Sequence, residues 1–131
     1  MSLCAACAGS GDAPAPAAFP AAALASLKSD SGALSIEVRT SPSQPPTRGA
    51  ASVEYIVRDV DGAPVDGLSL VVVPWMPAHG HGASVRATVA AQGGGRYLIT
   101  GVSLFMAGHW ELRSDFSGPR SDHVAPSFEV E

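Results

Sequence analysis

Residues 34–40 read LSIEVRT and residues 51–59 read ASVEYIVRD. In both stretches apolar side chains alternate with polar ones, and this period of two is typical of a β-strand with one face in a core. The prolines of the intervening SPSQPP, at residues 41–46, end the first strand. The two stretches therefore predict neighbouring strands of an antiparallel sheet that is buried on one face.

Apolar runs of similar length, separated by turn residues, continue to the end of the chain. DGAP at residues 61–64 and GGG at residues 93–95 mark turns, because their glycines permit a positive φ angle. Residues 68–75 (LSLVVVPW) are apolar on both faces, as expected of a central strand that is covered on both sides. The predicted strands lie at residues 34–40, 51–59, 68–75, 84–91, 96–102, 110–115 and 123–131.

Seven short strands without helical periodicity favour an all-β fold, an immunoglobulin-like antiparallel β-sandwich, with a barrel as the alternative. Residues 33–131 have the length of one such domain, and a chain of 131 residues has no room for a second core. Charged residues make up 15% of the chain, the net charge is −4, and the eight basic residues are scattered singly. Nucleic acid is therefore not an expected partner. No apolar run reaches the length of a membrane span.

The first residues of the chain resemble the end of a bacterial lipoprotein signal. Residues 4–7 read CAAC, and small residues precede Cys7, which is then the candidate for lipidation. The sequence departs from that pattern at Cys4, where a large aliphatic residue is usual. The alternative is a C-x-x-C metal or redox pair, but such pairs work at the start of a helix, and an Ala/Pro/Gly-rich tract follows Cys7.

Residues 1–32 are accordingly expected to hold the remnant of this signal and a flexible tether, ahead of a domain at residues 33–131. The alanine-rich composition of residues 21–28 is compatible with a short helix inside the tether. The expected location is extracytoplasmic, either periplasmic or attached to the membrane through a lipid anchor.

Two loops stand apart in composition and carry the candidate chemistry. Residues 75–82 read WMPAHGHG, and residues 105–110 read FMAGHW. Because chain direction reverses at every strand of an antiparallel sandwich, both loops are expected at one end, with His123 at the other. The candidate metal ligands are Met76, His79, His81, Met106 and His109.

Thioether and imidazole ligands together suit a soft ion, above all Cu(I). Zinc gains little from methionine, and the loops offer neither carboxylate nor thiolate for a closed zinc site. Trp75 and Trp110 are expected to shield the ion. The alternative is purely structural: Met-Pro with glycines makes a tight turn, the methionines plug the core, and the histidines are exposed.

The ordered elements DGxP, a valine-rich strand, MPxHGHG at residues 76–82, Gly95-x-Tyr97 and FMxGxW at residues 105–110 resemble the YtkA-like domain family, with kinship to FixH-like proteins. The resemblance covers roughly residues 33–131. It implies an immunoglobulin-like β-sandwich in exported or membrane-anchored bacterial proteins, often associated with copper handling or with assembly of copper-containing oxidases.

Other chemistries are less well supported. Asp59-x-Asp61-Gly62 has the start of a calcium loop but lacks the later bidentate acid. Asp115, Asp122 and His123 are expected near one turn, without an identifiable nucleophile. The sequence therefore predicts no enzyme. It predicts a copper-binding or copper-delivery accessory module with a copper-protein or envelope partner, and its rival is a metal-free structural or protein-interaction module.

Overall fold

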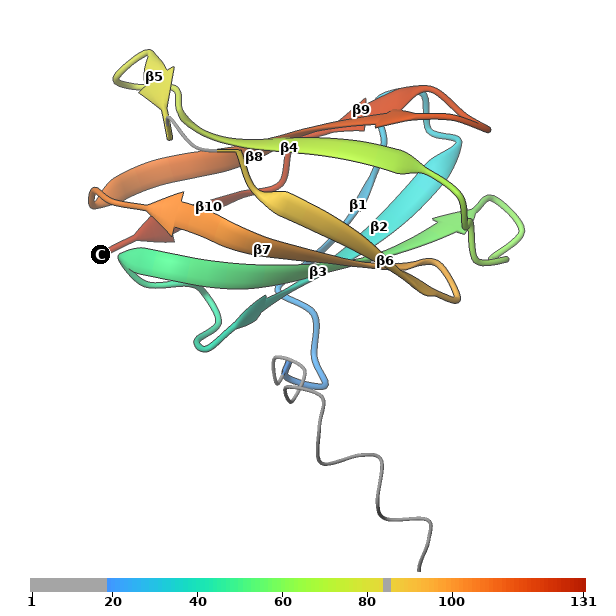
Figure 1. Cartoon of the computed structure of the whole chain (residues 1–131), viewed down its shortest axis with the longest axis horizontal. Coiled ribbons are helices and arrows are strands. Elements are labelled where there is room, and N and C mark those ends of the chain that lie inside the picture. Colours follow the sequence, from blue (N-terminus) through green and yellow to red (C-terminus); the bar gives the residue numbers. More distant parts are fainter. Residues whose placement is uncertain (1–18, 84–85) are drawn as a thin grey trace, which may run out of the picture.

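The computed structural model describes residues 19–83 and 86–131, which form two antiparallel sheets of five strands each. One sheet, called sheet A below, has the order β1 (Ala25–Lys28), β2 (Leu34–Ser41), β3 (Gly49–Asp59), β7 (Arg96–Leu104) and β6 (Thr88–Gly93). The other, sheet B, has the order β10 (Ser127–Val130), β8 (Gly108–Ser117), β4 (Ser69–Met76) and β5 (His81–Gly82), with β9 (Asp122–Val124) also paired to β8. Figure 1 shows the sheets as two layers. The predicted antiparallel β-sandwich is confirmed, and the sheets do not close into a barrel.

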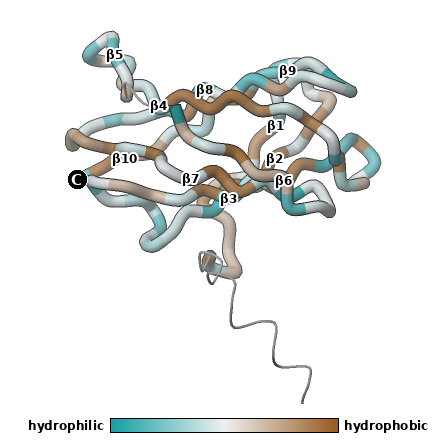
Figure 2. Tube along the Cα trace, in the orientation of Figure 1, coloured by the Kyte–Doolittle hydropathy of each residue, from teal (hydrophilic) through white to brown (hydrophobic). Residues whose placement is uncertain are grey.

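The alternation in the sequence places one face of each strand in a shared core. In β2, Leu34, Ile36 and Val38 are buried, whereas the residues between them are partly exposed. In β8, Trp110 and Leu112 are completely buried. Figure 2 shows hydrophobic residues along the strands and hydrophilic ones at many of the turns. Burial of these inward faces supplies the main driving force for folding.

The start of the domain differs from the prediction. Residues 25–28 form β1, which pairs with β2 from Ala25 opposite Val38 to Lys28 opposite Ser35. A short helix over residues 21–28 is therefore wrong, and so is a tether that runs to residue 32. Leu27 packs partly against the core, which explains why this segment joins the sheet. Cys4 and Cys7 lie outside the described residues.

Three further predicted strands also differ from the structure. Strand β4 is not central, since within the described chain its second neighbour is the two-residue β5, and Val71 on its outer face is 40% exposed. The predicted last strand is divided into β9 and β10 before and after Pro126, whose carbonyl accepts a hydrogen bond from the Leu112 amide. The strand predicted at residues 84–91 starts at Thr88, and residues 84–85 are not described.

Side-chain hydrogen bonds join the two sheets inside the core. Tyr55 Oη of β3 lies 2.7 Å from Ser114 Oγ of β8, and both residues are fully buried. Tyr97 Oη of β7 donates to the Val65 carbonyl and accepts from the Leu68 amide, which fixes the chain as it enters β4. Within the described residues no helix is long and apolar enough to span a membrane.

Candidate metal site at one end of the sandwich

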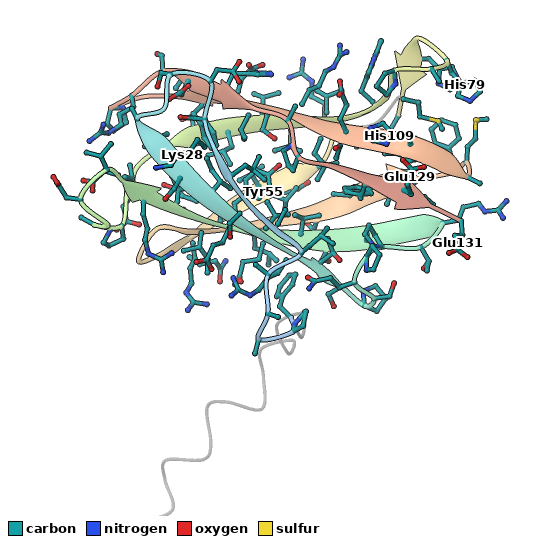
Figure 3. The ribbon with its side chains drawn as sticks, turned by 180° about the vertical axis from the view of Figure 1, so that it is seen from behind. Lys28, Tyr55, His79, His109, Glu129 and Glu131 are labelled. Carbon is teal, nitrogen blue, oxygen red and sulfur yellow. The ribbon has the colours of Figure 1, made fainter. Side chains whose placement is uncertain are left out.

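The two loops rich in methionine and histidine lie at the same end of the sandwich, which we call the Met/His end. Strand β4 ends there at Met76, opposite His81, and β8 begins there at Gly108, opposite Val130. Figure 3 shows His79 and His109 at this end, and sulfur atoms between them in the same view. His123 pairs with Asp115, six positions along β8 from His109, and so lies toward the other end as predicted.

The first loop is the tight turn of the β4–β5 hairpin. The amides of His79 and Gly80 both donate to the Met76 carbonyl, and Gly80 has a φ of +68°. A side chain at Gly82 would collide with the Pro74 carbonyl oxygen, so this position admits only glycine. The two glycines of the motif therefore have a structural role, which is to let the hairpin turn back closely on β4.

This turn brings the imidazoles of His79 and His81 together. Their ring centres lie 5.5 Å apart, and the ring planes are tilted by 32°. Both residues are exposed, and Figure 1 shows the hairpin standing off the body of the sandwich. The pair is therefore open to an ion arriving from solvent.

An aromatic wall continues from this pair into the core. The ring of His81 stacks on that of Phe105, with centres 6.0 Å apart and planes at 18°. Phe105 meets Trp110 edge to face at 5.3 Å, and Trp110 Nε1 donates to the Met106 carbonyl at 2.9 Å. Trp110 thus fixes the second loop, as well as filling the core. Sequence reasoning assigned Phe105 no role, although its position next to Met106 in a short loop was a usable signal.

The two methionines differ in their access to solvent. Met76 is only 1% exposed and belongs to the hydrophobic core, whereas Met106 is half-buried and packs against the edge of that core. A side chain at Gly108 would press on Met76 Cε at 2.8 Å, and Gly108 has a φ of +138°. The glycine of the second motif therefore makes room for the Met76 thioether. The burial of Met76 agrees with the metal-free alternative, in which the methionines fill the end of the core. Met106 is the methionine whose sulfur is more accessible to solvent.

His109 is separated from the other four candidates. Neighbouring residues of a strand point to opposite faces, and Trp110 points into the core, so His109 points out of sheet B. There its Nδ1 pairs with the Glu129 carboxylate of β10, directly across the ladder. Figure 3 shows the two side by side. The expected convergence of all five residues therefore does not include His109, and Glu129 was not foreseen.

Trp75 also points to the outer face of sheet B rather than into the core. Because Met76 is buried, its neighbour Trp75 faces outward, where the Arg113 guanidinium lies 4.5 Å from the ring centre. Of the two tryptophans expected to shield an ion, only Trp110 is on the correct face. The described residues contain no group of three or more His, Cys, Asp or Glu side chains with metal-site geometry.

The remaining polar clusters have evident structural roles. Asp59 Oδ1 accepts from the amides of Asp61 and Ala63, which is the bonding of a turn rather than of a calcium loop. Asp115, Asp122 and His123 do meet near one turn, with His123 Nδ1 2.7 Å from Asp115 Oδ1. Asp122, however, is bound to Ser29 and Ser31 of the β1–β2 turn.

A protein-family model described as YtkA-like matches residues 30–115 of the chain, from the β1–β2 turn into β8. This range includes all the candidate ligands and Phe105. The chain has no significant match among curated proteins or among solved structures.

Proposed function

The chain belongs to the YtkA-like family, and from that premise we propose that its Met/His end binds Cu(I), as the site of an exported copper-binding or copper-delivery accessory module. The proposed ligands are His79, His81 and Met106. Met76 is buried in the core beside Gly108 and is not among the proposed ligands. The role is binding rather than catalysis, and the expected partner is a copper protein or another protein of the envelope.

The observation that carries the proposal is the spacing of the two imidazoles. Two imidazoles that bind one ion through metal–nitrogen bonds of about 2.0 Å have ring centres roughly 5–6 Å apart. The ring centres of His79 and His81 lie 5.5 Å apart, within this range. The β4–β5 turn therefore holds the two rings at a spacing that one bound ion could bridge, which would reduce the entropy lost on binding.

The surroundings of the pair favour a soft, weakly hydrated ion. Met106 is the accessible thioether at this end, and a thioether needs no deprotonation to coordinate Cu(I). Phe105 and Trp110 form an apolar wall beside His81. Such a wall disfavours ions that keep much of their water shell.

A competition titration with a Cu(I) chelator tests this proposal on the full chain carrying Cys4→Ser and Cys7→Ser, which removes competing thiols. We expect one Cu(I) per chain, and at least a tenfold loss of affinity in His79→Ala/His81→Ala and in Met106→Ala. His123→Ala is the matched control, since it removes an imidazole from the other end of the sandwich. Absence of stoichiometric binding, or equal affinity in all variants, would contradict the proposal.

The burial of Met76 favours a second candidate, a metal-free interaction module. In that case the partner surface would be the outer face of β4, where Val71 is 40% exposed and Val73 and Trp75 are half-buried. Binding of a partner there would survive loss of His79 and His81 and would fail in Val71→Glu. This is opposite to the result expected for a copper site.

Export and attachment through a lipid on Cys7 belong to the same proposal. They rest on the residues around Cys7, which lie outside the described part of the chain. Mass spectrometry of the mature protein from its native membrane would reveal a diacylglyceryl group on Cys7. A mature protein that retains residues 1–6 would contradict lipidation. The kinship to FixH-like proteins stays a prediction.

A further inference from the structure

A cavity of about 490 Å³ lies on the outer face of sheet A, away from the Met/His chemistry. One wall is the chain segment Phe19–Ala21, and the other walls are strand residues that include Arg39, Glu54 and Arg96. Its size is within the range of sites that hold small organic ligands, roughly 300–1,000 Å³. In Figure 1 the first described residues, in blue, lie beyond the β2–β3 layer, on the side away from sheet B.

The wall formed by the first described residues is firmly attached. Arg39 donates from Nε to the Pro20 carbonyl at 3.1 Å and from Nη2 to the Ala21 carbonyl at 2.9 Å. Gln44 Nε2 donates to the Ala22 carbonyl at 2.9 Å. Side chains therefore hold this segment, which forms one wall of the cavity, against β2.

The mixed lining of the cavity includes the apolar side chain of Ile56, on the outer face of sheet A. Tyr55 and Val57 point into the core, so Ile56 between them points outward. Nevertheless Ile56 is only 6% exposed and stands apart from the core cluster. Phe19 and Ile56 are the lining residues with large apolar side chains, and they offer apolar contacts beside the charged ones.

The side chains around the cavity carry a net positive charge, whereas the whole chain is negative. The outer face of sheet A carries more arginines than glutamates, although the net charge of the chain is −4. The residues are Arg39, Arg58, Arg96, Glu37 and Glu54. Arg39 is already engaged, since its hydrogen bond to Glu37 lowers the pKa of that carboxyl. Arg96 is different: its side chain is 57% exposed, and within the described residues its one ion pair is to Glu54 at 3.4 Å. Several of its donors remain available at the rim.

We propose that this cavity binds a small carboxylate with an apolar body. The carboxylate pairs with the Arg96 guanidinium, and the apolar body lies on Ile56 against Phe19. Guanidinium is suited to a carboxylate because two parallel N–H groups match the two oxygens. The adjacent Glu54 carboxylate disfavours a second negative charge, so a monocarboxylate fits better than a dicarboxylate.

An NMR titration of the full-length, isotope-labelled protein tests this site with three probes. Octanoate carries both features, octylammonium carries the same chain with the opposite charge, and acetate carries the charge alone. We expect saturable shifts with octanoate, confined to residues 19–22, 37–39, 54–58 and 92–96, and at least tenfold weaker binding of the other two probes. Equal binding of octylammonium, or octanoate shifts elsewhere on the molecule, would overturn the proposal.

Two variants separate a specific site from nonspecific adsorption. Arg96→Gln removes the charge at the rim and is expected to weaken octanoate binding about tenfold. The control is Arg113→Gln, the same substitution on the outer face of sheet B, which should leave binding unchanged. Equal losses in both variants would show that only the net charge matters and would overturn the proposal. Copper affinity plays no part in this test, so it is independent of the function proposed for the Met/His end.

Discussion

At the scale of single residues, Tyr55 is the clearest example of a polar group that the core requires. Its hydroxyl and that of Ser114 are 2.7 Å apart, and Ser114 Oγ also donates to the Leu112 carbonyl at 2.9 Å. Burial raises the pKa of Tyr55, so the phenol stays protonated. Because the single Ser114 hydroxyl hydrogen goes to the Leu112 carbonyl, Tyr55 is the donor to Ser114. The bond joins the sheets at a point where no water competes.

Tyr55→Phe is expected to lower the free energy of unfolding by about 1–2 kcal/mol, because the buried Ser114 oxygen loses the hydrogen bond that it accepts from Tyr55. Urea unfolding followed by tryptophan fluorescence measures this loss. Adding Ser114→Ala to Tyr55→Phe should recover part of the loss, since the buried oxygen that lacks a donor is then removed. A double variant less stable than the sum of the two single changes would contradict this account.

Asp122 makes stability depend on pH at the other end of the sandwich. Partial desolvation alone would raise its pKa, but hydrogen bonds from Ser31, Ser29 and the His123 amide outweigh that effect and lower the pKa from 3.8 to about 2. A carboxyl with a lowered folded pKa stabilises the protein fully above its unfolded pKa. This contribution is lost as the pH falls toward the folded value.

We therefore expect wild-type stability to decline between about pH 4 and pH 2, with a shallower decline in Asp122→Asn. Chemical unfolding at a series of pH values measures both slopes. Asp61→Asn is the control, since that carboxylate lies in an exposed turn. Identical slopes for wild type and Asp122→Asn would show that the Ser29–Ser31–Asp122 contacts contribute nothing.

At the scale of elements, the β4–β5 hairpin determines whether His79 and His81 form a pair. Gly82→Ala would place a methyl group against the Pro74 carbonyl and push β5 away from β4. We expect the His79–His81 contact to be lost and Cu(I) affinity to fall at least tenfold. Imidazole resonances in NMR spectra and the chelator competition measure the two effects.

Gly80→Ala is the matched control for this hairpin. Gly80 has a positive φ but no atom within 4 Å of an added Cβ, so alanine there introduces strain of about 1 kcal/mol without a collision. It should affect affinity less than Gly82→Ala does. The reverse order would indicate that turn conformation, and not close approach of the strands, positions the imidazoles.

Alternation in the sequence identifies strands that have one buried and one solvent face, such as β2 with Leu34, Ile36 and Val38. It does not identify β1, whose residues 25–28 read ASLK and offer a single large apolar side chain. For β4 it predicts a central position, because valines occupy both faces of the strand. The observed position of β4 depends on its pairing with β8 and β5. The alternation of residues within β4 itself cannot predict these partners.

At the scale of the whole molecule, the sandwich starts at the chain segment that precedes β2. Strand β1 covers the edge of β2 over four residue pairs, and Leu24 and Leu27 pack partly against the core. A chain that starts at residue 33 would expose that edge and lose both side chains. A chain that starts at residue 19 keeps them.

The shorter chain is expected to be less stable than the longer one by at least about 2 kcal/mol, since each buried leucine contributes about 1.5–3 kcal/mol when fully buried. Thermal and urea unfolding of the two chains compare them directly. Equal stability would mean that β1 is only loosely attached and that the domain boundary predicted from the sequence is adequate.

Local sequence rules were sufficient to establish the fold class and the end of the sandwich at which Met76, His79, His81 and Met106 lie. Alternation sets which residues are inward, and chain reversal at each strand sets which loops share an end. Which candidates face one another was settled by tertiary contacts alone. His109 and Trp75 each adjoin a buried residue in their strands, so they point to the outer face of sheet B. Phe105, in contrast, contacts both His81 and Trp110. Side-chain direction at a loop depends on where each strand ends and on what packs across the core, and these contacts are long-range.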